Sequence, residues 1–284
     1  MSTRTTSFRP RSLAVTCCAL LTASTAAIAQ FADQVPPQHR GVGISQKLDN
    51  QLPLDAYFSN EKGQVVHLGD YFKPGKPIIL TLNYYNCPGL CTYQLNGLVD
   101  ALRELKWTPG NEFDIITVSF DPMENSKLAV LKKESYLAAY GKPEAAAGWH
   151  FLCGDKDSIA RLVEAAGFAY RWNPDTQQWV HDAALIIVKP DGKISRYIGS
   201  IKYEPETVRL SLVEASKGKV GSIWDQIFLL CAHYDSQRGV YTAQAMAAMR
   251  LAGFATLTTL GITLGAFWAW ERRKKSSTLT GLAT

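Results

Sequence analysis

The sequence predicts an α/β fold, a mixed β-sheet flanked by helices, followed by one C-terminal transmembrane helix. Three observations support this prediction. Apolar, strand-like runs alternate with helix-like segments over most of the 284 residues. A Pro190-Asp-Gly-Lys193 turn joins two late strand-like runs, as in a β-hairpin. An uncharged run near the C-terminus is about as long as a bilayer core is thick.

The first half of the expected domain contains the clearest elements. A short strand is predicted over residues 64–68, and a buried strand over 78–85, where apolar residues are almost continuous. Leucines recur at helical spacing over 91–106, and a third strand, 113–120, stops at Asp121-Pro122. Ser126 is the expected N-cap of a helix that runs to Tyr140.

The second half continues the alternation. The expected elements are a strand over 149–153, a helix over 157–166, strands over 180–189 and 193–198, and a helix over 205–215. A cysteine pair where a strand meets a helix, followed by a late hairpin and a terminal helix, is typical of thioredoxin-like architecture. We therefore expect one thioredoxin-like domain over residues 30–222.

Cys87-Pro-Gly-Leu-Cys91 is the most informative motif, because it follows the buried strand directly. Cysteines four residues apart near a helix start are expected on one face, close enough for a disulfide or for a shared soft metal ion. A helix N-terminus stabilises negative charge, so thiolates of low pKa are expected there. The motif predicts redox or copper chemistry.

The N-terminal residues 1–29 have the pattern of a secretory signal peptide. Arg4, Arg9 and Arg11 precede a short apolar run, and Ala27-Ile-Ala29 is a small-residue cleavage site. The expected product is an exported protein.

The C-terminal part predicts a membrane anchor. Residues 223–247 form a juxtamembrane segment, 248–270 a transmembrane helix and 271–284 a cytoplasmic tail that begins with a basic cluster at 272–275. The domain is therefore expected on the extracytoplasmic side of the cytoplasmic (inner) membrane. The net charge of +5 comes from the basic residues at the two ends, so a nucleic-acid partner is not supported.

These motifs resemble the Sco (SenC-like) copper chaperones of cytochrome c oxidase assembly, over roughly residues 54–215. The resemblance is carried by Cys87-Pro-Gly-Leu-Cys91, by the strand end Val118-Ser-Phe-Asp-Pro122, and by His181 ahead of the Pro190-Asp-Gly192 turn. It implies a thioredoxin-like fold, one copper ion held by Cys87, Cys91 and His181, and a Cys87–Cys91 disulfide in the oxidised protein. It also implies a client, the binuclear copper centre in subunit II of the oxidase.

The chain departs from the family pattern at two positions. Thr92 stands where the family often has proline, and Asn125 stands where it often has a second aspartate. The three expected ligands are unaffected. Two thiolates and an imidazole suit both Cu(I) and Cu(II), whereas a structural zinc site usually has four protein ligands.

Other candidates are weaker. Asp121 either ends its strand in a turn or supports the metal site from the second layer. Cys231 and His233 either pack beside the membrane or form a second copper site. Cys153 is expected to be a small buried residue.

Two functions remain open. The first is a membrane-anchored metallochaperone, which binds and delivers copper and is not a turnover enzyme. The alternative is a thiol-disulfide oxidoreductase that acts on the copper-site cysteines of the oxidase, with Cys87 as nucleophile and Cys91 as resolving thiol. The proposed need for His181 separates them, since a reductase has no evident use for it.

Overall fold

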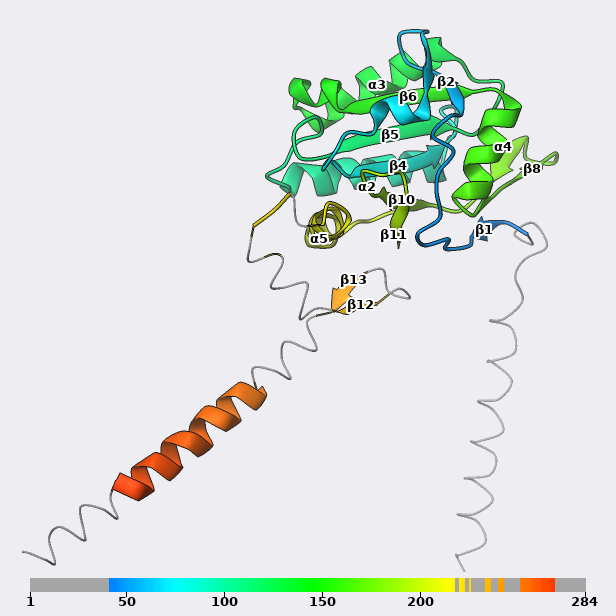
Figure 1. Ribbon diagram of the computed structural model, residues 1–284. Helices are drawn as coiled ribbons and strands as arrows, with labels where there is room; N and C mark the ends of the chain where they lie inside the picture. Colours follow the sequence, from blue (N-terminus) through cyan, green and yellow to red (C-terminus); the bar gives the residue numbers. More distant parts are fainter. Residues whose placement is uncertain are drawn as a thin grey trace, which may run out of the picture. The chain divides into compact units, whose positions relative to one another are not determined.

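The computed structural model describes residues 41–217, 220–222, 225, 233–235, 240–242 and 251–268 (Figure 1). The chain divides into two compact units, residues 1–42 with 170–181 and residues 43–169 with 182–284. The expected signal peptide, the basic tail and Cys231 lie outside the described residues. The predicted domain boundaries therefore stay predictions.

The larger unit is built on a seven-stranded mixed sheet with the order β11-β10-β4-β5-β6-β2-β3. Its central strands β4, β5 and β6 are parallel, and the outer strands pair antiparallel. This arrangement confirms the predicted thioredoxin-like mixed sheet. The strands are β2 (Tyr57–Ser59), β3 (Val65–His67), β4 (Ile78–Asn83), β5 (Asp114–Ser119), β6 (Trp149–Gly154), β10 (Ala184–Val188) and β11 (Ile194–Gly199).

Three helices pack over one face of this sheet, namely α2 (Leu90–Glu104), α3 (Ser126–Tyr140) and α5 (Pro205–Ala215). Every residue of β4 and β5 is buried, as expected for parallel strands covered on both faces. Alternate strand residues point into a core shared with α2 and α5; the cluster includes Ile79, Ile115, Phe151, Leu98, Leu102, Val208 and Leu212.

Helix α2 approaches the chain after β11 very closely. A β-carbon at Gly97 would lie 2.0 Å from the carbonyl oxygen of Ile201, which is far inside van der Waals contact. Glycine at this position therefore lets α2, which carries Cys91, sit tightly against that segment.

The N-cap of helix α3 is one residue earlier than the predicted Ser126. The Asn125 side chain accepts hydrogen bonds from the backbone N–H groups of Lys127 and Leu128 and is the N-cap, while Ser126 is the first helical residue. Gly141 ends the helix in the left-handed conformation, at φ 78°.

Smaller elements complete the larger unit. Helix α4 (Lys156–Ala165) packs against β6 and β7 (Phe168–Ala169), and β7 pairs with β1 (Gly43–Ile44). Two short 3₁₀ helices, η2 (Leu68–Tyr71) and η3 (Pro143–Ala147), connect strands and helices. The strands β12 (His233–Asp235) and β13 (Val240–Thr242) pair antiparallel.

The strand predicted over 180–189 is wrong in one respect, because the structure divides it. Residues up to Val180 belong to β9 (Gln178–Val180), which forms a hairpin with β8 (Arg171–Asn173) in the smaller unit. Trp172 and Trp179 pair edge to face across this hairpin, with ring centroids 5.1 Å apart. The strand of the main sheet, β10, starts only at Ala184.

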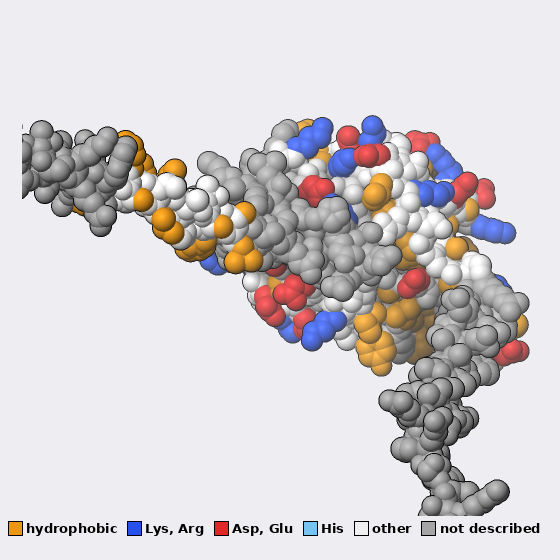
Figure 2. All heavy atoms as spheres, turned by 90° about the horizontal axis from the view of Figure 1, so that it is seen from below, with side chains coloured by type: hydrophobic (Ala, Val, Ile, Leu, Met, Phe, Trp, Pro, Cys, Tyr) orange, Lys and Arg blue, Asp and Glu red, His pale blue; other side chains and the backbone are white. Residues whose placement is uncertain are grey.

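The C-terminal helix, Leu251–Trp268, is long and apolar enough to cross a membrane, with a mean hydropathy of 1.4. Its side chains are exposed throughout, and Figure 2 shows hydrophobic side chains along its surface. The other residues of the predicted segment 248–270 lie outside the described residues.

Candidate metal centre

The two cysteines flank the start of α2 at the C-terminal end of β4. Cys91 is in the first turn of the helix, whereas Cys87 lies in the connection before it, so the expectation of one shared helix face is wrong. The sulfurs are brought together differently. The backbone N–H of Cys91 donates to Cys87 Sγ at 3.4 Å, which uses one of the free N–H groups at the helix start. The two cysteines are not joined in a disulfide, and both are buried.

The surroundings of Cys91 raise its pKa, contrary to the low-pKa expectation. Burial is the main cause, because it disfavours the charged thiolate, and the neighbouring Cys87 adds to it. Two donors act in the opposite direction. The backbone N–H of Tyr84 donates to Cys91 Sγ at 3.3 Å, and the polar side chain of Asn83 nearby also lowers the pKa.

Glu124 fixes the backbone that leads to Cys87. This carboxylate is 92% buried and accepts the backbone N–H of Tyr85 at 2.6 Å and that of Asn86 at 2.8 Å. It also accepts the hydroxyl of Ser119, at the end of β5, at 2.6 Å. Burial raises the pKa of Glu124, although these donors oppose the rise. The loop after β5 thereby positions the loop after β4.

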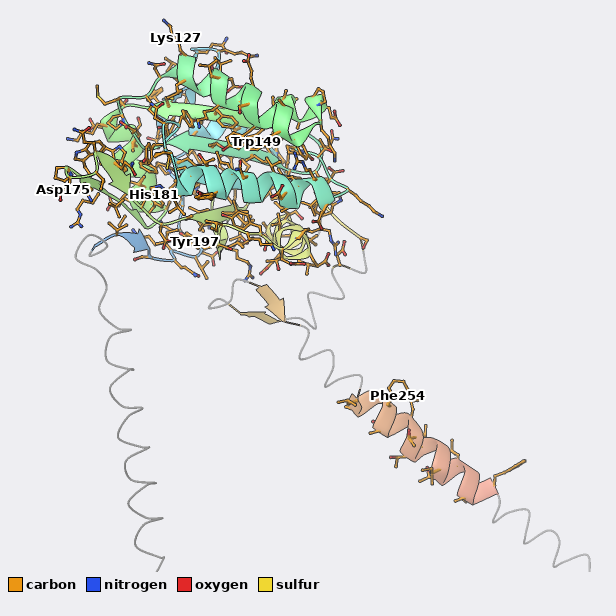
Figure 3. The ribbon with its side chains drawn as sticks, turned by 180° about the vertical axis from the view of Figure 1, so that it is seen from behind. Lys127, Trp149, Asp175, His181, Tyr197 and Phe254 are labelled. Atoms are coloured by element: carbon orange, nitrogen blue, oxygen red, sulfur yellow. The ribbon has the colours of Figure 1, made fainter. Side chains whose placement is uncertain are left out.

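His181 lies in the connection between β9 and β10 (Figure 3). It is 6% exposed. One ligand atom each from Cys87, Cys91 and His181 lies within 4.8 Å of the others, so the three could hold a metal ion. This donor set of two sulfurs and one imidazole nitrogen fits a soft metal such as copper.

The remaining predicted site residues have mostly structural contacts. Asp121 lies two residues after β5 ends, and its carboxylate accepts the backbone N–H of Met123 at 2.9 Å, which shapes the turn that presents Glu124. Its expected support of the metal site stays a prediction. Thr92, which replaces the family's proline, donates its hydroxyl to the Cys87 carbonyl at 3.1 Å.

Among the described cysteines, Cys153 is not part of this group. Cys153 is buried in the core at 4% exposure, as predicted, and burial raises its pKa to about 12. His233 begins β12, and Cys231 is outside the described residues, so the second copper site stays a prediction.

The sequence analysis missed three polar residues around the cysteines: Glu124, Asn83 and Gln94. Each had a signal in the sequence. Glu124 follows a strand parallel to β4, and loops at the carboxyl ends of neighbouring parallel strands meet at one edge. Asn83 ends an otherwise apolar strand, and Gln94 lies in the buried stripe of α2.

Comparisons with known proteins agree with this architecture. A model of the SCO1/SenC family matches residues 52–215, which include Cys87, Cys91 and His181. No curated protein matches the chain.

Solved structures also resemble the chain. A protein of Aquifex aeolicus VF5 is 23% identical, covers 60% of this chain and 94% of its own, and has a TM-score of 0.52, which supports the fold. Arabidopsis thaliana ScoI with copper bound is 15% identical, with 60% and 99% coverage and a TM-score of 0.47. BsSco, described as a member of the Sco family of cytochrome c oxidase assembly proteins, is 22% identical, with 61% and 98% coverage and a TM-score of 0.49.

Proposed function

Because the chain belongs to the SCO1/SenC family, we propose that it is a membrane-anchored copper metallochaperone. It binds one copper ion through Cys87, Cys91 and His181 and delivers it to the binuclear copper centre of cytochrome c oxidase subunit II, or helps that centre to mature. The observation that carries the proposal is the gathering of these three ligand atoms within 4.8 Å.

The donor set suits a protein that must both hold and release copper. Thiolate sulfurs favour Cu(I), and the imidazole helps to retain Cu(II). Three protein ligands leave a coordination position for a ligand of the recipient, so the metal can transfer by stepwise exchange. Bound copper requires deprotonated thiols, so loading releases the thiol protons of Cys87 and Cys91.

A copper titration of the reduced full-length chain in detergent tests the binding. We expect one copper per chain, with a sulfur-to-Cu(II) charge-transfer absorption. His181→Ala should lose or shift this absorption, because the imidazole no longer holds Cu(II). His67→Ala is the matched control, since His67 is at the end of β3 and has a separate hydrogen bond to the Asp55 carbonyl. Identical spectra for the two variants would rule out His181 as a ligand.

Membrane anchoring is the second part of the proposal. The support is the apolar helix Leu251–Trp268, together with the basic cluster that follows in the sequence. A single anchor raises the effective concentration of the domain near a membrane-bound client. The full chain should remain in the membrane fraction after a carbonate wash, and a chain that ends at residue 250 should not. If the carbonate wash released both chains from the membrane fraction, the proposed anchor would be contradicted.

A thiol-disulfide oxidoreductase is the second candidate. The supporting observation is the contact between Cys87 Sγ and the N–H of Cys91, which places two cysteines that are not joined in a disulfide side by side at a helix start. Rapid disulfide exchange with copper-site peptides, without stable copper binding in the titration, would favour this role.

A further inference from the structure

A fully buried glutamine connects the helix that carries Cys91 to the strand that follows His181. Gln94 lies in α2, about one turn after Cys91, and its exposed fraction is 0%. Its Nε2 donates to the Ala184 carbonyl at 2.8 Å. Ala184 is the first residue of β10 and comes three residues after His181. One side chain therefore links the two segments that supply Cys91 and His181.

This link lies where the sheet stops joining β4 to β10. In the described strands, the ladder between them ends at Leu80 and Ile186. Strand β4 nevertheless continues to Asn83, and β10 starts at Ala184. Asn83 Nδ2 donates to Gln94 Oε1 at 3.0 Å, so the two amides and the Ala184 carbonyl form a chain of hydrogen bonds across this end. The amide chain takes the place of strand pairing beside the metal centre.

The direction of both hydrogen bonds follows from their partners. A backbone carbonyl can only accept, so Gln94 must direct its NH₂ group to Ala184 and its oxygen to Asn83. A buried amide is unfavourable unless it is hydrogen-bonded, and an apolar side chain of the same length would fill the space without that requirement. The two hydrogen bonds, rather than packing, therefore account for a glutamine at this position.

A very short connection joins Ala184 to His181. Only Asp182 and Ala183 lie between them, and the N–H of Ala183 donates to Asp182 Oδ1 at 2.8 Å. Both Ala183 and His181 are buried. Three residues span at most about 10 Å, so the anchor on the Ala184 carbonyl restricts where the imidazole can lie.

We propose that Gln94 is a positioning residue of the metal centre, which ties α2 to β10 and thereby sets the place of His181 relative to the two cysteines. The inference rests on the proposed copper site. Thiolates favour Cu(I), whereas the imidazole helps to retain Cu(II), so the link acts mainly on the oxidised metal. Residues that orient metal ligands without touching the metal contribute to its affinity in this way.

The test compares full-length wild-type protein in detergent with Gln94→Met. Methionine is unbranched and of similar length, and it removes both hydrogen bonds. Gln94→Leu is a second variant, which decides the outcome if Gln94→Met does not fold. Circular dichroism establishes that each variant is folded.

Thr81→Val is the matched control. Thr81 is also fully buried and lies on β4, and its hydroxyl donates to Thr117 Oγ1 of β5 at 2.9 Å. The substitution therefore removes a buried hydrogen bond between two elements of the same core but leaves the connection to Ala184 in place.

The first measurement uses copper. Competition titrations give the affinities for Cu(II) and Cu(I), and electron paramagnetic resonance of the Cu(II) form reports coupling to the imidazole nitrogen. We expect Gln94→Met to lower the Cu(II) affinity about tenfold and to weaken the nitrogen coupling, while the Cu(I) affinity stays within about threefold of wild type. A purely structural role would lower both affinities together or neither. Thr81→Val should keep the wild-type ratio of the two affinities.

The second measurement needs no metal. Hydrogen exchange followed by mass spectrometry reports the backbone N–H groups of residues 181–185 in the metal-free chain. We expect them to exchange about threefold to tenfold faster in Gln94→Met, because the start of β10 loses one hydrogen bond that anchors it. Exchange of the same residues in Thr81→Val should match wild type.

The failures are distinguishable. Wild-type protein that binds no copper would overturn the proposed function, and the exchange of residues 181–185 would then decide alone whether Gln94 places His181. If Gln94→Met and Gln94→Leu leave the affinity ratio and the exchange unchanged, or if Thr81→Val shifts both equally, the positioning role is wrong.

Discussion

The cysteine loop depends on a few buried polar side chains that hold backbone N–H groups in place. Glu124 is the clearest case, since its two oxygens accept from Tyr85, Asn86 and Ser119. A buried carboxylate with several donors is a rigid anchor, and a loop so anchored changes little when a metal ion binds or leaves. The ligand geometry is therefore set before copper arrives.

Glu124→Gln should weaken this anchor. The glutamine side chain has one acceptor oxygen, so a backbone N–H of the cysteine loop loses its partner. A buried N–H without a partner costs about 1–3 kcal/mol, and we expect the free energy of unfolding to fall by that amount in urea denaturation.

The matched control is Glu112→Gln. Glu112 is only partly buried, and its carboxylate also accepts a backbone N–H, from Thr108 at 3.1 Å. Because water can reach this site, we expect Glu112→Gln to lower the free energy of unfolding by less than Glu124→Gln does, by about 0.5 kcal/mol. If both variants lose the same free energy of unfolding, burial of Glu124 does not determine the size of the loss.

A second polar cluster joins elements at the far edge of the sheet. Glu61, in the turn between β2 and β3, pairs with Lys133 of α3 and lies 4.0 Å from Nδ1 of His150 in β6. Burial, with Lys133 nearby, lowers the pKa of His150 to about 4 although Glu61 opposes the shift. Burial is the largest single influence and raises the pKa of Glu61, but the hydrogen bond and charge of Lys133 together with backbone hydrogen bonds outweigh it, and the net direction is down.

These shifts predict a pH dependence of stability. A neutral, buried His150 stabilises the fold above its ordinary pKa of 6.5, and this contribution is lost as pH falls through about 4. The free energy of unfolding should therefore decline between about pH 6.5 and 4, by at most about 3 kcal/mol from this residue. His150→Phe should flatten that part of the curve, measured by urea denaturation at stepped pH, whereas an unchanged slope would contradict the assignment.

The elements that sequence could predict are those with strong periodicity. Strands β4 and β5 and helix α2 follow from continuous apolar runs and from leucines at helical spacing. The strand predicted over 180–189 could not be divided correctly, because only His181 and Asp182 interrupt the apolar residues between Val180 and Val188, while β9 pairs with β8 and β10 joins the main sheet. The partner of a strand is decided by long-range contacts, which local pattern does not contain.

The same limit applies to the site. Its cysteines were recognisable from spacing alone, and His181 from family resemblance. The high pKa of Cys91 was not predictable, since it depends on how deeply the helix start is buried. Glu124 and the Asn83–Gln94 pair act through contacts between residues distant in sequence or on different elements, so only the folded chain reveals their partners.

The whole molecule combines a thioredoxin-like domain with an apolar C-terminal helix long enough to cross a membrane. The domain positions three soft or borderline ligand atoms at the edge where β4 ends and α2 begins. In the proposed function, the apolar helix Leu251–Trp268 keeps this domain near a membrane-bound client, so that copper delivery needs both parts.

X-ray absorption at the copper edge of the loaded full-length chain tests the central claim most directly. The account predicts two sulfur ligands at thiolate distance and one imidazole nitrogen, with the nitrogen contribution lost in His181→Ala and retained in His67→Ala. Copper bound by sulfur alone in the wild-type protein, or an imidazole contribution that survives in His181→Ala, would contradict the three-ligand site.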